Sequence, residues 1–301
     1  MSKQDSLLRH KIIIQKLRSQ ASSFGEIQNK LQSETDLLDV DNLVTSLRTF
    51  QRDLLDIASF YGIEIKYNRS KKVYFIENDS EDEYNERMFE ALDVFQALNV
   101  NQSFSAYIQF DTRKPKGTEH LSGILYAIQN KFQIQFRYQK FWETEEEIRS
   151  VEPYLLKEFR KRWYVFAYDL KHKEFRTFGL DRLSALNISS NKFQFPQKIN
   201  LKEYFKDCFG IVGPNEGEVQ DILLKFTSHQ GNYIKTMPLH ESQQIVKETP
   251  EETLVKLRLI PTYDFLMEIL YYGEFVQVLE PKHLADEIKH KFQRAVILYQ
   301  S

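Results

Sequence analysis

Aromatic rings and arginines occur together near the middle of the chain. Across residues 162–182, aromatic and branched residues alternate along two extended runs, and the polar residues 169–173 separate the runs. This pattern predicts a β-hairpin with two different faces. Arginine can pair with anions and can also stack on planar rings. The hairpin is therefore predicted to present a recognition surface for a flat or anionic ligand.

A second candidate surface lies on a predicted helix over residues 45–61. Its apolar residues recur about every 3.6 positions and predict one buried stripe. That stripe consists of Leu47, Phe50, Leu54, Ile57, Ala58 and Tyr61. Hydroxyl, amide and guanidinium groups lie on the opposite face or beside it, where they could bind phosphate oxygens and base edges. These residues are Thr45, Ser46, Arg48, Thr49, Gln51 and Arg52.

The elements around this helix predict how it is positioned. Residues 7–17 have helical spacing, and Ser23 with Glu26 forms a capping-box pattern that opens a second helix ending near Leu31. After the third helix, residues 63–76 predict a hairpin whose tip carries basic side chains. Those side chains are Arg69, Lys71 and Lys72. Three helices followed by a basic hairpin is the order of a winged helix-turn-helix, which predicts binding to double-stranded DNA.

Other interpretations of residues 45–61 remain open. A helix with one polar side is most often simply solvated, and Asp53 and Asp56 would repel phosphate. Asp56 can also pair with Arg52 four residues earlier. In addition, the acidic insert after Leu31 is longer than the turn of about 3–4 residues in a minimal helix-turn-helix.

Composition limits the class of protein. A chain of 301 residues is long enough for several domains, and 42% apolar with 28% charged residues is typical of globular domains. A net charge of −2 does not by itself indicate a nucleic-acid partner, although a local basic face can bind phosphates. The single cysteine, Cys208, excludes an internal disulfide and a cysteine zinc cluster. Without a membrane-length apolar run or a signal-like N-terminus, the sequence predicts a cytoplasmic protein with no membrane partner.

The rest of the chain divides into three further parts. An acidic break after residue 78 precedes predicted helices that connect to a group of short strands, beginning with the alternating residues 132–138. Phe195 and Pro196 begin a linker, after which strands and helices are mixed. The predicted domains are 1–78, a winged helix-turn-helix; 79–130, a helical linker; 131–195, a small β-barrel; and 196–301, an α+β extension.

Several short runs resemble the WYL domain of bacterial transcriptional regulators. The resemblance rests on Trp-Tyr-Val at 163–165, Arg-Thr-Phe at 176–178 and Leu-Asp-Arg at 180–182, with Val165 where the family usually has leucine. It extends to residues 132–138 and 149–154. Residues 46–54 resemble the recognition helix of such regulators, and residues 273–281 resemble the C-terminal extension that follows WYL domains.

The resemblance implies an α+β multidomain fold with an SH3- or Sm-like barrel that senses a nucleotide or single-stranded nucleic acid. The arginines match the basic patch of the family, and the aromatic residues are candidate stacking partners. The implied effector residues are Tyr138, Arg149, Tyr154, Trp163, Tyr164, Arg176 and Arg182. Each aromatic residue has a strong competing core interpretation, which is favoured for Trp163, and Arg182 could instead pair with Asp181 or Asp169.

No motif in the sequence indicates catalysis. The seven histidines show no HExxH spacing, and there is no GxSxG motif, Walker loop or GxGxxG motif. We therefore predict a non-enzyme without cofactor or metal, and the resemblance implies a homodimeric, effector-responsive DNA-binding regulator. The alternatives are a single-stranded nucleic-acid binding accessory protein without a promoter target and, less favoured, an enzyme acting on nucleotides.

Overall fold

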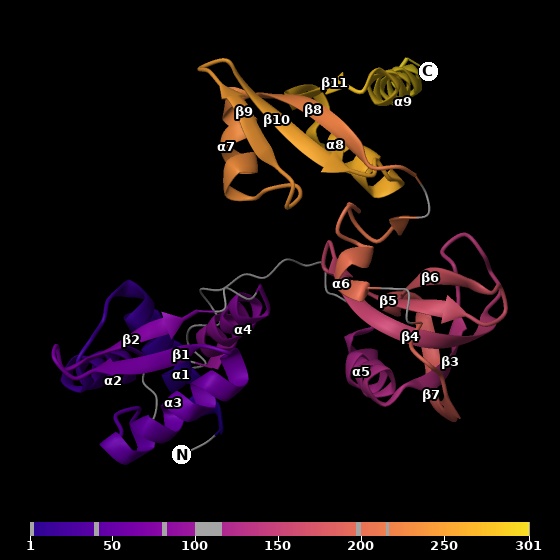
Figure 1. The fold of residues 1–301 in the computed structure, drawn as a ribbon. Coiled ribbons are helices and arrows are strands. Elements are labelled where there is room, and N and C mark those ends of the chain that lie inside the picture. Colours follow the sequence, from indigo (N-terminus) through magenta and orange to yellow (C-terminus); the bar gives the residue numbers. More distant parts are fainter. Residues whose placement is uncertain are drawn as a thin grey trace. The chain divides into compact units, whose positions relative to one another are not determined.

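The computed structural model describes residues 3–38, 42–79, 83–99, 116–196, 200–214 and 217–300. The chain forms two compact units, Met1–Thr112 and Arg113–Ser301 (Figure 1). Asp39 and Asp41, which belong to the acidic insert after Leu31, lie outside the described residues, as does Pro115. None of the helices in the described ranges has the length and apolar character needed to cross a membrane.

The N-terminal unit contains helices and one antiparallel hairpin, in the order predicted for a winged helix-turn-helix. Its elements are α1 (Lys3–Ser19), α2 (Phe24–Leu38), α3 (Leu47–Tyr61), β1 (Glu64–Asn68), β2 (Val73–Asn78) and α4 (Glu83–Asn99). The capping box is confirmed: Glu26 N–H donates to Ser23 Oγ at 3.3 Å, and Ser23 N–H donates to Glu26 Oε2 at 2.6 Å. The Ser23 hydroxyl, which donates to Glu26 Oε2 at 2.7 Å, and the Ser23 N–H together lower the pKa of the Glu26 carboxyl. Helix α2 extends beyond its predicted end, to Leu38.

Helix α1 is the centre of this unit. Leu8, Ile13 and Ile14 are buried among side chains of α2, α3 and α4, including Ile27 and Phe50. Burial continues around the helix, so that Arg9, His10 and Lys11 are buried as well. A buried cation is costly unless it is paired, and Arg9 is paired with a carboxylate of α3. The unit is therefore held together by an ionic contact as well as by apolar packing.

The second unit begins with a five-stranded antiparallel sheet in the order β6-β5-β4-β3-β7. The strands are β3 (Phe132–Tyr138), β4 (Glu147–Phe159), β5 (Arg162–Asp169), β6 (Glu174–Gly179) and β7 (Leu183–Lys192). The turn η3 (Leu180–Arg182) joins β6 to β7, and η2 (Thr118–His120) leads into helix α5 (Leu121–Asn130), which packs on the sheet through Ile124 and Ala127. The pairing of β4 with β5 shifts register between Pro153 and Leu155, because proline cannot donate a ladder hydrogen bond.

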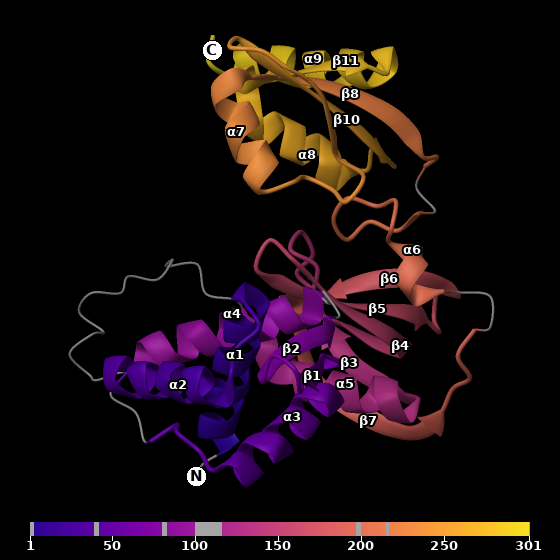
Figure 2. The same ribbon diagram turned by 60° about the vertical axis from the view of Figure 1, so that its left-hand side comes forward.

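The C-terminal part contains a four-stranded sheet in the order β11-β8-β10-β9 and three helices that share its core (Figure 2). Its elements are β8 (Gln220–Thr227), α7 (Ser228–Thr236), β9 (Gln244–Glu248), β10 (Glu252–Leu259), α8 (Tyr263–Tyr272), η5 (Gly273–Phe275), β11 (Val276–Glu280) and α9 (Lys282–Leu298). Helix α9 packs on this sheet through an apolar stripe, since Leu284 and Ile288 are buried and Phe292 packs beside them. Strand β9 was not predicted, and all its residues are exposed.

A short segment beginning with α6 (Leu201–Tyr204) contacts both sheets of this unit. Ile211 is its central residue: the Ile211 carbonyl accepts from Thr177 Oγ1 of β6 at 3.1 Å, and the Ile211 N–H donates to Asp264 Oδ2 of α8 at 2.8 Å. The preceding Gly210 has a φ of +81°, and a Cβ there would lie 2.3 Å from Asp264 Oδ2. Only glycine fits this approach without displacing Asp264.

Candidate nucleic-acid interface and effector pocket

Helix α3 presents a polar face to solvent. Arg48, Gln51 and Arg52 are all exposed, and their spacing places them on one side of the helix. Among the described residues, neither Arg48 nor Arg52 takes part in an ion pair. Two guanidinium groups and one amide are therefore available on this face to bind an anionic partner.

Three more of the predicted DNA-binding residues lie at or just before the start of α3: Thr45, Ser46 and Thr49. Ser46 is the N-cap, and its Oγ accepts from the Thr49 N–H at 3.2 Å. Thr45 is half-buried, and its N–H donates to Gln28 Oε1 at 3.0 Å. The helix therefore begins at Leu47 rather than at the predicted Thr45. Ser46 and Thr49 are placed at the helix N-terminus, where free N–H groups favour an anion.

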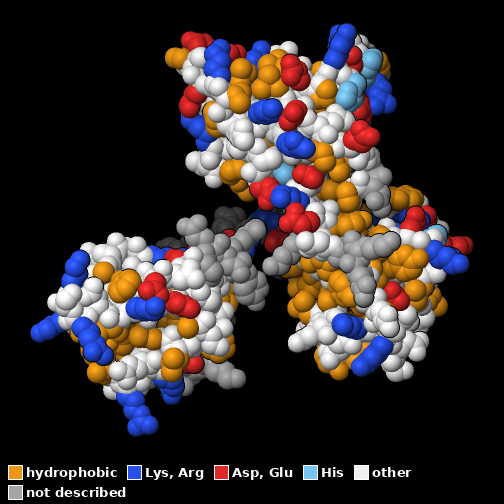
Figure 3. Space-filling view, in the orientation of Figure 1, with side chains coloured by type: hydrophobic (Ala, Val, Ile, Leu, Met, Phe, Trp, Pro, Cys, Tyr) orange, Lys and Arg blue, Asp and Glu red, His pale blue; other side chains and the backbone are white. Residues whose placement is uncertain are grey.

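The hairpin tip between β1 and β2 adds further cations. Arg69, Lys71 and Lys72 are exposed, and Asn68 Oδ1 closes the turn by accepting from Lys71 N–H at 3.1 Å and from Ser70 Oγ at 2.8 Å. Lysine and arginine side chains protrude from several places on the N-terminal unit (Figure 3). Because α3 and the hairpin belong to this one compact unit, its two sets of basic residues are carried by a single body.

The other side of α3 differs in part from the prediction. Phe50, Ile57 and Tyr61 are buried as predicted, but Leu47 is 47% exposed and Ala58 is also exposed. Asp53, which was predicted to repel phosphate, is buried and paired with Arg9, whose positive charge offsets its own.

Asp53 is the acceptor for the buried arginine of α1. Arg9 Nε and Nη2 donate to Asp53 Oδ2 and Oδ1 at 2.6 and 2.8 Å, and His10 Nε2 lies 3.5 Å from Oδ1. Burial alone would raise the pKa of the Asp53 carboxyl, but the bonds from Arg9 and His10 hold it below its usual value. His10, Asp53 and Asp56 place potential metal-ligand atoms within 4.8 Å of one another. The Arg9 guanidinium already binds both oxygens of Asp53. The Arg9–Asp53 pair is therefore a salt bridge that links α1 to α3.

A pocket of about 460 Å³ lies on the five-stranded sheet, a volume within the usual range for small-molecule sites. Its wall includes Ile211, Val212 and Gly213 of the segment that joins the two sheets. Four lining side chains are cationic and one is acidic. The cations are Lys140, Arg149, Arg176 and Arg182, and the acid is Glu174.

The two sheets of the second unit match known domain families. Residues 119–188, which contain α5 and most of the five-stranded sheet, match the WYL domain, and residues 218–296 match the WCX domain. The chain contains a WYL domain and a WCX domain. The WYL match begins before β3 because α5 contributes Ile124 and Ala127 to the core of the sheet.

Whole-chain comparisons give more distant similarities. The chain is 26% identical over 178 residues to the uncharacterized HTH-type transcriptional regulator YobV of Bacillus subtilis (strain 168), covering 58% of this chain and 54% of YobV. Proteasome accessory factor B/C (PafBC) of Arthrobacter aurescens aligns over 99% of this chain and 47% of its own length, with 19% identity and a TM-score of 0.38. A CRISPR Cas-related protein aligns over 88% and 76%, with 12% identity and a TM-score of 0.39. The chain thus spans about half the length of YobV and of PafBC.

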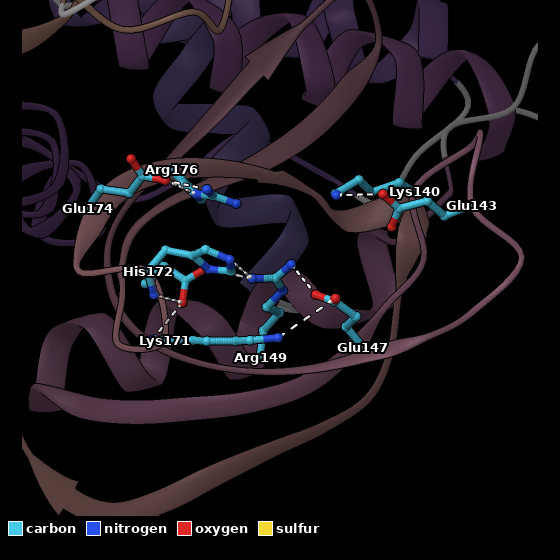
Figure 4. Close-up of polar contacts among 9 residues, drawn as sticks. Lys140, Glu143, Glu147, Arg149, Lys171, His172, Glu174 and Arg176 are labelled. Atoms are coloured by element: carbon cyan, nitrogen blue, oxygen red, sulfur yellow. Dashed lines mark hydrogen bonds and ion pairs between the residues drawn. The ribbon is translucent and has the colours of Figure 1, made fainter.

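Arg149 of the WYL domain is buried within a network of polar contacts (Figure 4). It pairs with Glu147, and its Nη1 donates to Asp169 Oδ2 at 3.0 Å and lies 2.7 Å from His172 Nδ1. Asp169 also accepts from the N–H groups of Lys171 and His172. Arg149 therefore ties the start of β4 to the β5–β6 turn, in addition to lining the pocket.

Arg176 and Arg182 are less enclosed than Arg149. Arg176 pairs with Glu174 two residues earlier, with Nε donating to Oε1 at 2.6 Å, and both side chains are partly open to solvent. The Arg182 guanidinium lies 5.3 Å from the ring centroid of Tyr138, and its Nε lies 3.6 Å from Asp181 Oδ1. The predicted competing partner, Asp181, is therefore present for Arg182, whereas Asp169 pairs with Arg149. A partly exposed pair such as Arg176–Glu174 contributes only about 0–1 kcal/mol, so Arg176 can exchange Glu174 for an anionic ligand at little cost.

The predicted aromatic residues occupy different places. Tyr138 lines the pocket, its hydroxyl accepts from Gly179 N–H at 3.3 Å, and burial raises its pKa. Tyr154 is buried in a core cluster, and its hydroxyl donates to Glu152 at 2.9 Å. Trp163 packs against the core beside α5, and Tyr164 is buried. The structure thus brings Tyr138 together with the three predicted arginines, while Tyr154, Trp163 and Tyr164 lie outside the set of lining residues.

Some lining residues were not among the sequence predictions. They include Lys140 and Trp142 from the β3–β4 loop, Phe175 beside Arg176, and the segment 211–213. Phe175 follows Glu174 in the same strand and could have been found from its alternation with Arg176. The loop residues had no periodic signal, and segment 211–213 reaches the pocket only through tertiary packing.

The stability of the WYL domain is expected to fall in acid because of Asp169. Burial alone would raise its pKa, but bonds from His172 and from two backbone N–H groups, together with the nearby Arg149 charge, hold it below the usual 3.8. The stabilisation is therefore complete above pH 3.8 and decreases as the pH falls toward the lower folded-state value. Urea unfolding followed by tryptophan fluorescence reports this domain, since both tryptophans, Trp142 and Trp163, lie in it.

The matched variant for this measurement is Asp169→Asn, which keeps the shape of the side chain and removes its titration. It is expected to be less stable than the wild type at neutral pH and to lose less stability on acidification. Equal acid dependence in the two proteins would contradict the role assigned to Asp169.

Proposed function

We propose that this chain is a DNA-binding transcriptional regulator whose WYL domain binds an effector. The observation that carries the proposal is the polar face of α3, where Arg48, Gln51 and Arg52 are exposed beside a buried apolar stripe. The name of the Bacillus relative, an HTH-type transcriptional regulator, supports the same assignment. The predicted domain limits, 1–78, 79–130, 131–195 and 196–301, are part of this proposal.

In the proposed complex, α3 enters the major groove and the hairpin tip touches the DNA backbone. Arg48, Gln51 and Arg52 contact base edges or phosphates, and Thr45, Ser46 and Thr49 act at the helix N-terminus. Arg69, Lys71 and Lys72 bind phosphates, so they contribute affinity without sequence preference. Asp53 does not oppose this arrangement because it is buried against Arg9.

The test of DNA binding is selection of bound fragments from the source genome, followed by competition with random duplex. If the chain is a regulator, the bound fragments are expected to share a common sequence. Binding to that sequence is expected to persist when random duplex DNA is added as competitor. Preference for single strands over every duplex would instead favour the single-stranded nucleic-acid binding accessory protein. Turnover of added nucleotides, with or without divalent metal, would favour an enzyme.

The proposed effector is a nucleotide or single-stranded nucleic acid bound in the WYL pocket. Tyr138, Arg149, Arg176 and Arg182 line that pocket, and rings next to cations suit a ligand with bases and phosphates. Tyr154, Trp163 and Tyr164 are proposed to support the pocket through the packing of β4 and β5. Effector binding changes DNA affinity only if the effector binds one arrangement of the protein better than another. We further expect a homodimer, which sedimentation of the full chain tests.

Arg176→Ala is expected to weaken effector binding roughly tenfold, the effect of losing one hydrogen bond to a charged group. The loss is limited because Arg176 must release Glu174 before it can bind phosphate. Titration of the protein with oligodeoxythymidylate measures the effect. The control is Arg258→Ala, which removes an exposed arginine from β10 of the WCX domain. Equal losses in the two variants would indicate a general charge effect and contradict a role of Arg176 in the pocket.

A further inference from the structure

Two large aromatic side chains stand at the tip of the β3–β4 loop. Phe141 and Trp142 are the central residues of a turn in which Glu143 N–H donates to the Lys140 carbonyl at 3.1 Å. Phe141 is 67% exposed and Trp142 is 77% exposed. Turn positions normally carry small or polar residues, so this turn does not require either ring.

The loop itself is braced, although its tip is exposed. Gln139 Nε2 donates to the carbonyls of Glu143 and Thr144 at 3.3 and 3.2 Å. The Phe141 ring lies 4.9 Å from the Arg182 guanidinium and 5.6 Å from that of Arg162. Phe141 thus has partners within the WYL domain, which hold the turn next to the pocket.

Trp142 differs from its neighbour. No ring contact or cation–π contact in the described part of the chain includes Trp142. Its side chain nevertheless lines the pocket that contains Lys140, Arg176 and Arg182. An indole that is open to solvent and next to several cations has a free face for a planar group, and the cations can bind the phosphate attached to that group.

We propose that Trp142 stacks on one unpaired base of the effector and determines the preference of the pocket for ligands that carry a base. Arg176 and Lys140 bind the adjoining phosphate after releasing Glu174 and Glu143, their present partners. This inference rests on the proposed effector function. The contacts of Phe141 with Arg162 and Arg182 hold the turn in place while Trp142 takes up the base.

The first experiment uses Trp142 as its own reporter. The chain has two tryptophans, so Trp163→Phe leaves Trp142 as the single indole. Adding oligodeoxythymidylate to this variant is expected to quench the fluorescence, because a base stacks on the indole. Inorganic tripolyphosphate, which has charge but no base, is expected to bind without comparable quenching. Equal quenching by both probes, or quenching by neither while the oligomer binds, overturns the proposal.

The second experiment compares affinities. Trp142→Ala is expected to bind oligodeoxythymidylate roughly 5- to 150-fold more weakly, as for the loss of one base–aromatic stack, with unchanged affinity for tripolyphosphate. Trp142→Phe is expected to retain most of the affinity. The control Tyr271→Ala removes an exposed ring from α8 of the WCX domain and is expected to change neither affinity.

The outcomes separate this inference from the proposed function. Suppose that Trp142→Ala binds the oligomer as well as the wild type does, while Arg176→Ala binds it weakly. The stacking role of Trp142 is then wrong, but the pocket remains supported as the effector site. If the wild type binds neither probe, both are wrong. Adenosine monophosphate distinguishes the source of the base: affinity equal to that of the oligomer indicates a mononucleotide effector, and much weaker affinity indicates a single strand.

Discussion

Replacing Arg48 and Arg52 together by alanine is expected to abolish specific binding to duplex DNA. Both side chains are exposed on α3, and each arginine that contacts DNA typically contributes about 1–3 kcal/mol, so affinity should fall roughly 30-fold or more. If both arginines contact phosphates, the slope of log affinity against log salt should decrease by about 1.8. Electrophoretic or fluorescence titration at several salt concentrations measures both quantities.

The matched control removes two positive charges from the WCX domain instead. Arg258 and Arg294 are exposed, and their double alanine variant has the same net charge as the α3 variant. It is expected to bind duplex DNA as the wild type does, and both variants should retain effector binding. Unchanged duplex affinity in the α3 variant would show that another surface binds DNA.

Asp53→Ala is expected to destabilise the N-terminal unit by about 3–5 kcal/mol, the usual cost of removing one partner of a buried ion pair. The variant removes the carboxylate that both Nε and Nη2 of the fully buried Arg9 bind. Hydrogen exchange measured by mass spectrometry is suited to this test because it resolves α1 and α3 from the rest of the chain. Exchange in both helices should accelerate, while exchange in the WYL domain should not change.

The double variant Arg9→Met with Asp53→Leu distinguishes the cost of removing one member of the ion pair from the cost of losing the pair itself. Replacing both partners by apolar residues removes the desolvation cost, so the double variant is expected to be more stable than either single substitution. A double variant as unstable as the sum of the single ones would mean that Arg9 and Asp53 contribute independently, with no coupling energy between them.

Local patterns in the sequence predicted most of the helices and strands. They predicted less well which side chains are buried and which residues those side chains contact. The buried residues Phe50, Ile57 and Tyr61 followed from helical periodicity, and the Ser23 cap followed from local spacing. Asp53 could not be placed in the same way, because its partner Arg9 is 44 residues away in the chain. Periodicity describes one helix, whereas the burial of a charged residue depends on the residues that a second helix brings to it.

The pocket on the WYL sheet illustrates a similar limit. Alternation identified the strands, but both faces of β5 are buried: Val165 and Ala167 pack on the side of α5, and Phe166 packs with Phe205 of the joining segment. An aromatic side chain in such a strand is therefore buried in a core whichever face of the sheet it points to. Trp142 was not predicted because a turn has no periodicity, and its position at the pocket depends on how the turn is braced.

Ile211 is hydrogen-bonded to both domains of the second unit. Its carbonyl is held by Thr177 and its N–H by Asp264, while residues 211–213 form part of the pocket wall. A ligand that displaced this wall would also strain the hydrogen bonds from Ile211 to Thr177 and to Asp264. Gly210 allows the close approach of the segment to Asp264, because any larger residue would displace that carboxylate. Binding in the pocket is therefore expected to be felt at the start of α8 as well as in β6.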